Sequence, residues 1–326
     1  MEDARDLGVD PAGIRPPPGM PEPAWIDVHG PVHYREWDGP RDRPTFVLVH
    51  GLGGSLLTWS LVAPGLAAHG RVLALDLAGF GRTPSAGRPA DVGSNRRLLA
   101  GFLRAMDLPP VVLVGNSMGG MISLLQCAIE PESVGAMILV DPVVPRVLTD
   151  GRISLRVALG FLATASRRLG PRIVRSRARA LGPEGLVRDT LAACVADPDA
   201  IDPGLVAAMV DQLAEHRGAE DDAIMAFVEA TRSLVDTHIR ATRYREMVRG
   251  IRQPALVLHG ALDRLVPTAA VRRAVEGHDT WTLHVLPGVG HLPQMEAPQR
   301  WLSLATSWLD ETRTRLDAAC VPDSSL

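Results

Sequence analysis

Short runs of apolar residues recur along the chain and alternate with segments of helical composition. Such uninterrupted runs are typical of strands that are buried on both faces of a sheet. The runs are 46–49, 72–75, 111–114, 136–140 and 255–258. Residues 281–286 alternate between apolar and polar instead, as a half-buried strand does, and helical patterns occupy 55–68, 94–106 and 121–128. Strands alternating with helices predict a mostly parallel sheet with right-handed crossovers.

The same pattern divides the chain into segments. The first residues are rich in proline and lack the apolar run of a secretory signal, so we expect a disordered arm. Residues 25–28 and 32–37 then predict a hairpin. Helical patterns without a buried strand fill 142–253, which is too long for a loop in a compact domain. The predicted units are an arm at 1–24, an α/β core at 25–141 and 254–316, a helical cap at 142–253 and a tail at 317–326.

Composition places the chain among globular proteins of one large or two smaller domains. Of its 326 residues, 46% are hydrophobic and 22% charged, which is enough for a sizeable core. A net charge of −3 argues against a nucleic-acid partner. The apolar runs are shorter than the ~20 residues of a membrane span. Cys127, Cys194 and Cys320 are too few and too scattered for a disulfide framework or a zinc site, so we expect reduced thiols and a cytoplasmic location.

Residues 115–119 read Gly-Asn-Ser-Met-Gly and connect a buried strand to a helix. Strand, glycine-flanked serine and helix together are the context of a nucleophile elbow. The serine sits in a very tight turn, and a side chain at Gly115 or Gly119 would collide with the neighbouring strand or helix. Ser117 is therefore the candidate nucleophile, held at the carboxyl end of the sheet near a helix N-terminus.

A nucleophilic serine needs a base, and the base needs an acid that orients it. Asp263 lies in a polar loop after the strand at 255–258, and His291 lies in the loop after the strand at 281–286. Upstream, His50-Gly51-Leu52-Gly53-Gly54 follows another buried strand and offers backbone N–H groups for an oxyanion hole. The order serine, acid, histidine, each just past a strand, is that of the α/β hydrolases.

At these residues the chain resembles an α/β-hydrolase-fold serine hydrolase with a helical cap, over roughly residues 25–316. Asp76–Thr83, Val140-Asp141-Pro142 and His291–Pro298 fit the family as well. The resemblance implies a mostly parallel eight-stranded sheet with helices on both faces and a cap inserted after the sixth strand.

The resemblance also implies roles for further residues. Backbone N–H groups of Leu52 and Met118 would form the oxyanion hole, with His50 and Gly51 supporting that loop. Asp76 is expected to tie down its own glycine-rich turn through Arg82 rather than to act in catalysis. Chemistry of this kind requires neither a metal nor an organic cofactor.

Two aspartates compete for the role of the acid. Members of this fold recruit it from the loop after the sixth strand, where Asp141 lies, or from the loop that contains Asp263. Asp141 precedes Pro142, where the chain leaves for the cap, so we expect it to hold the cap's hinge. We expect Asp263 to be the acid and the strand histidines His259 and His284 to be structural.

The substrate remains open at this point. We expect hydrolysis of a carboxylic ester, on a lipid or a small aromatic or aliphatic ester. Carbon–carbon bond hydrolases share Gly-Asn-Ser-Met-Gly but usually carry tryptophan after the catalytic histidine, where this chain has Leu292, and a richer glycine loop at the oxyanion strand. Thioester hydrolysis, cofactor-free peroxidation and ligand binding without catalysis are further alternatives. Epoxide hydrolases of this fold need an aspartate at position 117 and a pair of cap tyrosines, whereas the cap contains only Tyr244.

The cap is divided by charge. Ten arginines fall between Arg146 and Arg188, and ten carboxylates between Asp189 and Glu229. The two halves either are solvated faces or pair with each other; alternatively, the basic half attracts anionic substrates or a phospholipid surface, as a peripheral membrane contact. Ile153–Ala163, the most apolar stretch of the cap, would then pack on the core or line a substrate pocket.

Overall fold

The computed structural model describes residues 19–144, 155–215, 220–239 and 241–320. Its centre is an eight-stranded sheet in the order β1-β2-β4-β3-β5-β6-β7-β8. β1 and β2 pair antiparallel, as do β2 and β4, and all other neighbours are parallel. The strands are β1 (Ala24–Asp27), β2 (Pro31–Trp37), β3 (Phe46–Val49), β4 (Val72–Leu75), β5 (Val111–Asn116), β6 (Val134–Val140), β7 (Ala255–Gly260) and β8 (Trp281–Leu286).

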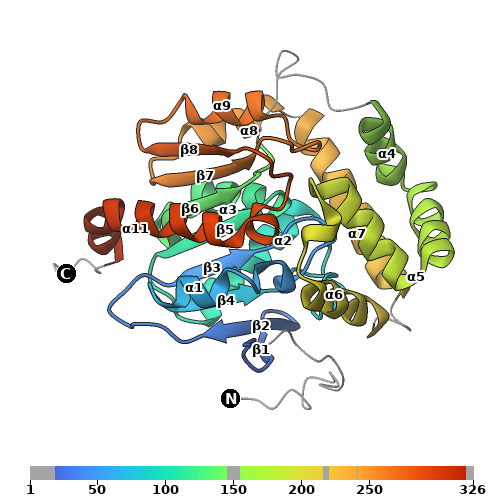
Figure 1. Ribbon diagram of the computed structural model, residues 1–326, viewed down its shortest axis with the longest axis horizontal. Coiled ribbons are helices and arrows are strands. Elements are labelled where there is room, and N and C mark those ends of the chain that lie inside the picture. The colour runs from blue at the N-terminus through green and yellow to red at the C-terminus, as the bar shows by residue number, and fades with distance from the viewer. Residues whose placement is uncertain (1–18, 145–154, 216–219, 240, 321–326) are drawn as a thin grey trace.

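Helices cover both faces of this sheet and one of its edges (Figure 1). The core helices are α1 (Ala63–Ala67), α2 (Val92–Ala105), α3 (Met118–Ile129), α9 (Thr268–Val275), α10 (Pro293–Glu296) and α11 (Pro298–Cys320). The segment between β6 and β7 contains α4 (Leu155–Ala165), α5 (Gly170–Cys194), α6 (Pro203–Glu215), α7 (Glu220–Ile239) and α8 (Ala241–Arg249). The predicted eight-stranded α/β-hydrolase fold with helices on both faces is confirmed.

Two buried clusters fill the space on the two faces of the sheet. Val47 and Val49 of β3 belong to a cluster with side chains of α2 and α3, whereas Phe46 and Leu48 pack with side chains of α1 and α11. Successive residues of a strand point to opposite faces, so an uninterrupted apolar run supplies both clusters. This is the physical reason why the apolar runs marked the strands of the central sheet.

The predicted helix at 55–68 is interrupted. Leu56–Trp59 form a 3₁₀ helix capped by the Ser55 side chain, and α1 begins only at Ala63. Pro64 lies in the first turn of α1, where its missing N–H has no intrahelical partner to lose. The proline therefore starts a second helix rather than continuing the first.

The ends of the body differ slightly from the predicted boundaries. β1 begins at Ala24, and Met20 packs against the buried cluster beside α1 and α11, while the Pro21 carbonyl accepts a hydrogen bond from the Arg35 guanidinium. Packing therefore begins inside the range expected to be a disordered arm, of which residues 1–18 lie outside the described residues. At the other end, α11 continues to Cys320, beyond the predicted boundary at 316.

The helical segment between β6 and β7 contacts the loops at the carboxyl edge of the sheet. The carbonyl of Cys194, at the end of α5, accepts a hydrogen bond from the His291 backbone N–H at 2.8 Å. Side chains of α7 approach the loops after β3 and β4, at Gly53 and Gly79. α8 packs instead against α3, and its Tyr244 and Val248 belong to a core cluster. Within the described ranges, no helix is both long and apolar enough to cross a bilayer.

Candidate active site

Ser117 occupies a strained backbone position between β5 and α3. Its φ of 54° and ψ of −113° lie outside the regions that non-glycine residues usually adopt, a conformation that costs about 1–3 kcal/mol. A Cβ at Gly115 would lie 2.6 Å from the Gly119 carbonyl oxygen, and one at Gly119 would lie 2.1 Å from the Val49 carbonyl oxygen. Both glycines are therefore required for the close approach of β5, α3 and β3. This geometry is the one predicted for a nucleophile elbow.

His291 and Asp263 form a buried hydrogen-bonded pair. Nδ1 of His291 lies 2.7 Å from Oδ2 of Asp263, and Oδ1 of Asp263 accepts hydrogen bonds from the Leu265 and Val266 backbone N–H groups at 2.7 and 3.0 Å. Burial alone would raise the pKa of Asp263, but the charge and hydrogen bond of His291 outweigh it and lower the pKa to about 2. Burial likewise opposes the charge on His291, yet Asp263 raises the pKa of His291 above 6.5.

Further hydrogen bonds join the His291 loop to the nucleophile loop and to the segment that follows α5. Nδ2 of Asn116, the residue before Ser117, donates to the His291 carbonyl at 3.2 Å and to the Val140 carbonyl at 3.1 Å. The Glu296 carboxylate accepts from the backbone N–H groups of Gly290 and Ala196 at 2.9 and 2.8 Å. One carboxylate thus joins the histidine loop to the cap segment that follows α5.

The predicted oxyanion loop lies beside Ser117. A Cβ at Gly51 would be 3.2 Å from the Ser117 Cβ, which is tighter than most Cβ contacts, so the two loops approach each other closely here. His50 bridges the loop to the next strand: its Nε2 accepts from the Leu77 backbone N–H at 3.0 Å, so its Nδ1 carries the proton and donates to the Gly51 carbonyl at 2.8 Å. Burial lowers the pKa of His50, which agrees with a neutral ring. Met118 opens α3, where its N–H has no intrahelical acceptor.

Asp76 is a fully buried carboxylate, and its contact to Arg82 differs from the expectation. Asp76 is fully buried and accepts hydrogen bonds from His33 Nδ1 at 2.7 Å, from the Leu56 N–H at 2.8 Å and from the Arg82 backbone N–H at 2.8 Å. The Arg82 guanidinium pairs with Glu215 of the cap instead. Burial would raise the pKa of Asp76, but the bond to His33 and the other donors lower it.

Asp141 lies behind the His291–Asp263 pair. Its φ is 44°, its Oδ1 accepts from the Gly260 N–H at 2.9 Å, and one donor atom each of Asp141, Asp263 and His291 lie within 4.8 Å of one another. Burial and the charge of Asp263 raise the pKa of Asp141 well above 3.8, which disfavours a second negative charge beside Asp263. His259 Nδ1 lies 2.9 Å from Asp141 Oδ1, and burial lowers the pKa of His259. The structure thus brings His291 into hydrogen-bond contact with Asp263, not Asp141.

Tyr244 has no place in this site. Its hydroxyl donates to the Val143 carbonyl at 2.7 Å, and the ring is buried in a core cluster. Tyr244 therefore anchors the start of the segment that leaves β6.

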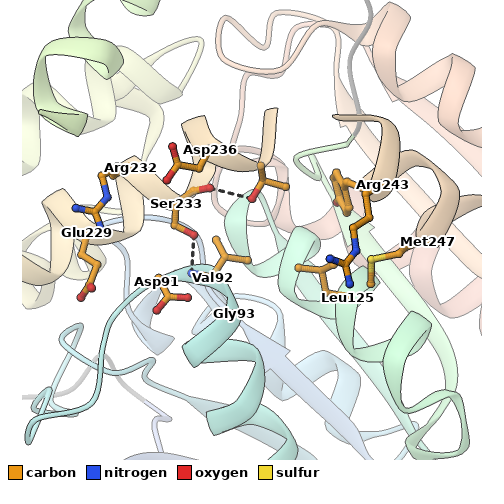
Figure 2. A pocket seen from close by; sticks show the side chains of 12 residues that line it. Asp91, Val92, Gly93, Leu125, Glu229, Arg232, Ser233, Asp236, Arg243 and Met247 are labelled. Carbon is orange, nitrogen blue, oxygen red and sulfur yellow. Dashed lines mark hydrogen bonds between the residues drawn. The ribbon is translucent and has the colours of Figure 1, made fainter. Parts of the chain in front are cut away.

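A separate pocket of about 390 Å³ lies between α2, α3, α7 and α8, and its lining excludes Ser117, Asp263 and His291 (Figure 2). Its polar groups join the cap to the core. Ser233 accepts from the Val92 N–H at 3.0 Å, and Glu229 of the lining accepts from the Ala90 N–H at 2.9 Å.

The structure adds residues that the sequence pattern did not single out. Phe227 of α7 approaches the oxyanion loop so closely that a Cβ at Gly53 would lie 2.9 Å from its ring. In the sequence, Asn116 and Glu296 stand out only as parts of motifs, and Cys194 only as a thiol. Their roles depend on contacts between segments about 100 residues or more apart. A helical pattern alone does not reveal which ring of the cap reaches the loop after β3.

The sheet order, the strained serine after β5 and the histidine–aspartate pair at the carboxyl edge define an α/β hydrolase. The chain belongs to the alpha/beta hydrolase family, whose family model matches residues 46–304. It is a hydrolase.

The proteins that this chain resembles differ from one another in activity. The chain is 30% identical over 285 residues to the dihydrolipoyllysine-residue acetyltransferase component of an acetoin cleaving system from Pseudomonas putida, covering 86% of this chain and 67% of that protein. It is 31% identical over 275 residues to a 2-hydroxy-6-oxo-2,4-heptadienoate hydrolase from Pseudomonas putida, covering 81% and 88%. A membrane phospholipase A, described as a bacterial virulence factor, superimposes with a TM-score of 0.69 at 25% identity, covering 90% and 87%.

Proposed function

We propose that the protein hydrolyses a carboxylic ester through an acyl-enzyme on Ser117, with His291 as base and Asp263 as the orienting acid. The observation that carries the proposal is the 2.7 Å bond between His291 and Asp263 beside a serine held at φ 54°. A carboxylate on Nδ1 keeps that nitrogen protonated, which leaves Nε2 of His291 free to accept the serine proton.

The reaction proceeds in two halves. Ser117 Oγ attacks the ester carbonyl carbon while Nε2 of His291 takes the hydroxyl proton. The backbone N–H groups of Met118 and Leu52 stabilise the resulting oxyanion; loss of one such donor typically costs about 10²–10³ in kcat. His291 then protonates the leaving alcohol, and the C–O bond to the alcohol breaks. Water, deprotonated by His291, attacks the acyl-enzyme and releases the acid and Ser117.

The electrostatics of the pair support this cycle. The ionised Asp263 compensates the positive charge that His291 acquires when it takes the proton, which is why its pKa lies above 6.5. The raised pKa of Asp141 disfavours a second negative charge beside Asp263. The set of groups therefore meets the requirements for activation of a hydroxyl nucleophile near neutral pH.

Carbon–carbon bond hydrolysis is the second candidate, because a 2-hydroxy-6-oxo-2,4-heptadienoate hydrolase is 31% identical over 88% of its own length. Leu292, which is buried next to His291, takes the place where such enzymes usually carry tryptophan. Ester cleavage needs only the groups named above, so we favour it.

A direct comparison of two substrates tests the proposal. Wild-type protein is assayed with p-nitrophenyl butyrate and with 2-hydroxy-6-oxo-2,4-heptadienoate, and Ser117→Ala serves as the blank for both. We expect a higher kcat/KM for the ester, abolished by the substitution. A higher kcat/KM for the dienoate would replace the proposal by its alternative, and ester turnover that survives Ser117→Ala would reject the nucleophile.

A further inference from the structure

Large apolar side chains that face solvent are concentrated on one part of the cap. Of the nine strongly exposed large hydrophobic residues in the described ranges, five lie between positions 159 and 181. Scattered exposed leucines are ordinary on soluble proteins, but a concentration of this kind marks an interaction surface. The five residues are Leu159, Leu162, Leu169, Ile173 and Leu181.

This finding differs from the expectation for the most apolar stretch of the cap. Leu159 and Leu162 were expected to pack on the core or to line a pocket, yet they are 55% and 56% exposed. α4 packs on α5 and α7. Residues 153–154 of that stretch lie outside the described residues.

Arginines surround these apolar side chains. Residues 159–181 contain six arginines and no carboxylate. Arg175 pairs with Asp221 at 2.6 Å and Arg177 pairs with Asp189, so the two halves of the cap do compensate each other in part. Within the described part of the chain, four arginines of this stretch have no carboxylate partner: Arg167, Arg168, Arg172 and Arg179.

The acidic half of the cap is used differently. Three of its carboxylates bind the core: Asp222 accepts from the Ser85 hydroxyl at 2.5 Å, Glu229 from the Ala90 N–H, and Glu215 from Arg82. Consequently these carboxylates do not neutralise the exposed arginines.

The two kinds of side chain share one helix face. Leu169, Arg172, Ile173 and Ser176 follow the i, i+3, i+4, i+7 spacing at the start of α5, and all are exposed. Exposed apolar side chains and basic charge both strengthen binding to a bilayer that contains anionic lipids, so their combination on one surface fits contact with the headgroup region. Figure 1 shows α4 and α5 as the outermost helices of the cap, with α7 between them and the sheet.

We propose that the α4–α5 face, formed by Leu159, Leu162, Leu169, Ile173 and Leu181 with the four unpaired arginines, binds the surface of a membrane that contains anionic phospholipids. The apolar side chains enter the acyl boundary while the guanidinium groups contact lipid phosphates. A second copy of the chain fits this face poorly, because an isologous contact would bring arginines against arginines. Membrane binding by this face is a property separate from ester hydrolysis and does not depend on Ser117.

Co-sedimentation with vesicles tests the surface. The full chain carrying Ser117→Ala, which prevents lipid turnover during the assay, is mixed with vesicles of phosphatidylcholine alone or of phosphatidylcholine and phosphatidylglycerol in a roughly 2:1 ratio. We expect binding to the anionic vesicles only. It should weaken as NaCl rises from about 0.1 M to about 1 M, since the screening length falls from about 10 Å to about 3 Å.

Variants locate the contact. Each arginine near an anionic surface strengthens binding about fivefold, so Arg168→Gln with Arg172→Gln should weaken it about 25-fold. Arg249→Gln with Arg252→Gln removes the same charge from exposed positions outside the face and should change binding little. Ile173→Gln should weaken binding about fivefold or more, whereas Ile129→Gln, at a residue 50% exposed on α3, should not.

Three outcomes would overturn the proposal: equal binding to both kinds of vesicle, equal loss in the two arginine pairs, or a concentration-dependent dimer in sedimentation velocity that Ile173→Gln abolishes. The last result would assign the face to a second copy. The same substitutions are also made in protein that retains Ser117, and turnover of p-nitrophenyl butyrate is measured. This turnover should stay unchanged whatever the vesicle experiment shows, so the two proposals are tested separately.

Discussion

Replacing Asp263 by asparagine should nearly abolish catalysis without unfolding the protein. Oδ1 would still accept the Leu265 and Val266 N–H groups, but an NH₂ group would stand where Oδ2 now lies 2.7 Å from His291 Nδ1. A donor at that place requires an unprotonated Nδ1. The ring proton then moves to Nε2, which can no longer accept the serine proton.

The magnitude follows from the loss of the carboxylate charge and of the correct tautomer together. The pKa of Asp263 lies at about 2 instead of 3.8, mainly through His291, which at 1.36 kcal/mol per pKa unit favours the ionised carboxylate by about 2 kcal/mol in the resting enzyme. The whole substitution costs about 10⁴ in kcat in triads of this kind.

Asp141→Asn is the matched control. Burial and the charge of Asp263 already raise the pKa of Asp141 and disfavour a negative charge there, so the neutral asparagine should disturb the His291–Asp263 pair little. The amide oxygen can still accept the Gly260 N–H that Oδ1 accepts now. We expect kcat for p-nitrophenyl butyrate to stay within about tenfold of wild type, a barrier change of ~1.4 kcal/mol or less. With both variants folded by circular dichroism, an inactive Asp141→Asn beside an active Asp263→Asn would refute the reasoning.

Three other predictions concern pH and stability. Ester kcat/KM should fall on the acid side with a midpoint above pH 6.5, because the base must be neutral and Asp263 raises the pKa of His291; a midpoint below 6.5 would contradict this. Gly119→Ala places a Cβ 2.1 Å from a strand carbonyl oxygen and should lower the free energy of unfolding in urea by about 3 kcal/mol or more. The control, Gly160→Ala, meets no atom within 4 Å and should be neutral or stabilising. Equal changes in the two variants would reject the packing argument. Deleting residues 1–18 should leave Tm nearly unchanged, since their proline-rich composition offers little apolar surface to pack; a loss of many degrees would show that the arm docks on the body.

The sheet and the nucleophile loop were predictable because both follow from local rules. Uninterrupted apolar runs indicated strands with two buried faces, and glycines around Ser117 indicated a turn that excludes side chains. The order of Ser117, Asp263 and His291 then placed all three at one edge, since parallel strands end on the same side. These inferences need no knowledge of how distant side chains pack.

Contacts between distant segments were not predictable in this way. The sequence indicated that Asp76 holds its own turn, but not that the Arg82 guanidinium turns to Glu215 of the cap. It marked residues 153–163 as apolar, but the same composition suits a buried helix and one whose leucines face outward. The approach of Phe227 to Gly53 likewise depends on how α7 lies across the sheet edge. Helix orientation depends on tertiary packing, which a single amphipathic pattern leaves open.

The central claim is that Ser117 is the residue that becomes acylated. Incubation with a fluorophosphonate probe, followed by proteolysis and mass spectrometry, tests it directly. We predict one phosphonylated peptide that contains Ser117, and neither label nor ester turnover in Ser117→Ala. Ser123, whose hydroxyl donates to the Gly119 carbonyl at 2.8 Å one turn away, provides the comparison position and should remain unlabelled. A probe adduct on another residue, or ester hydrolysis that persists in Ser117→Ala, would contradict the account.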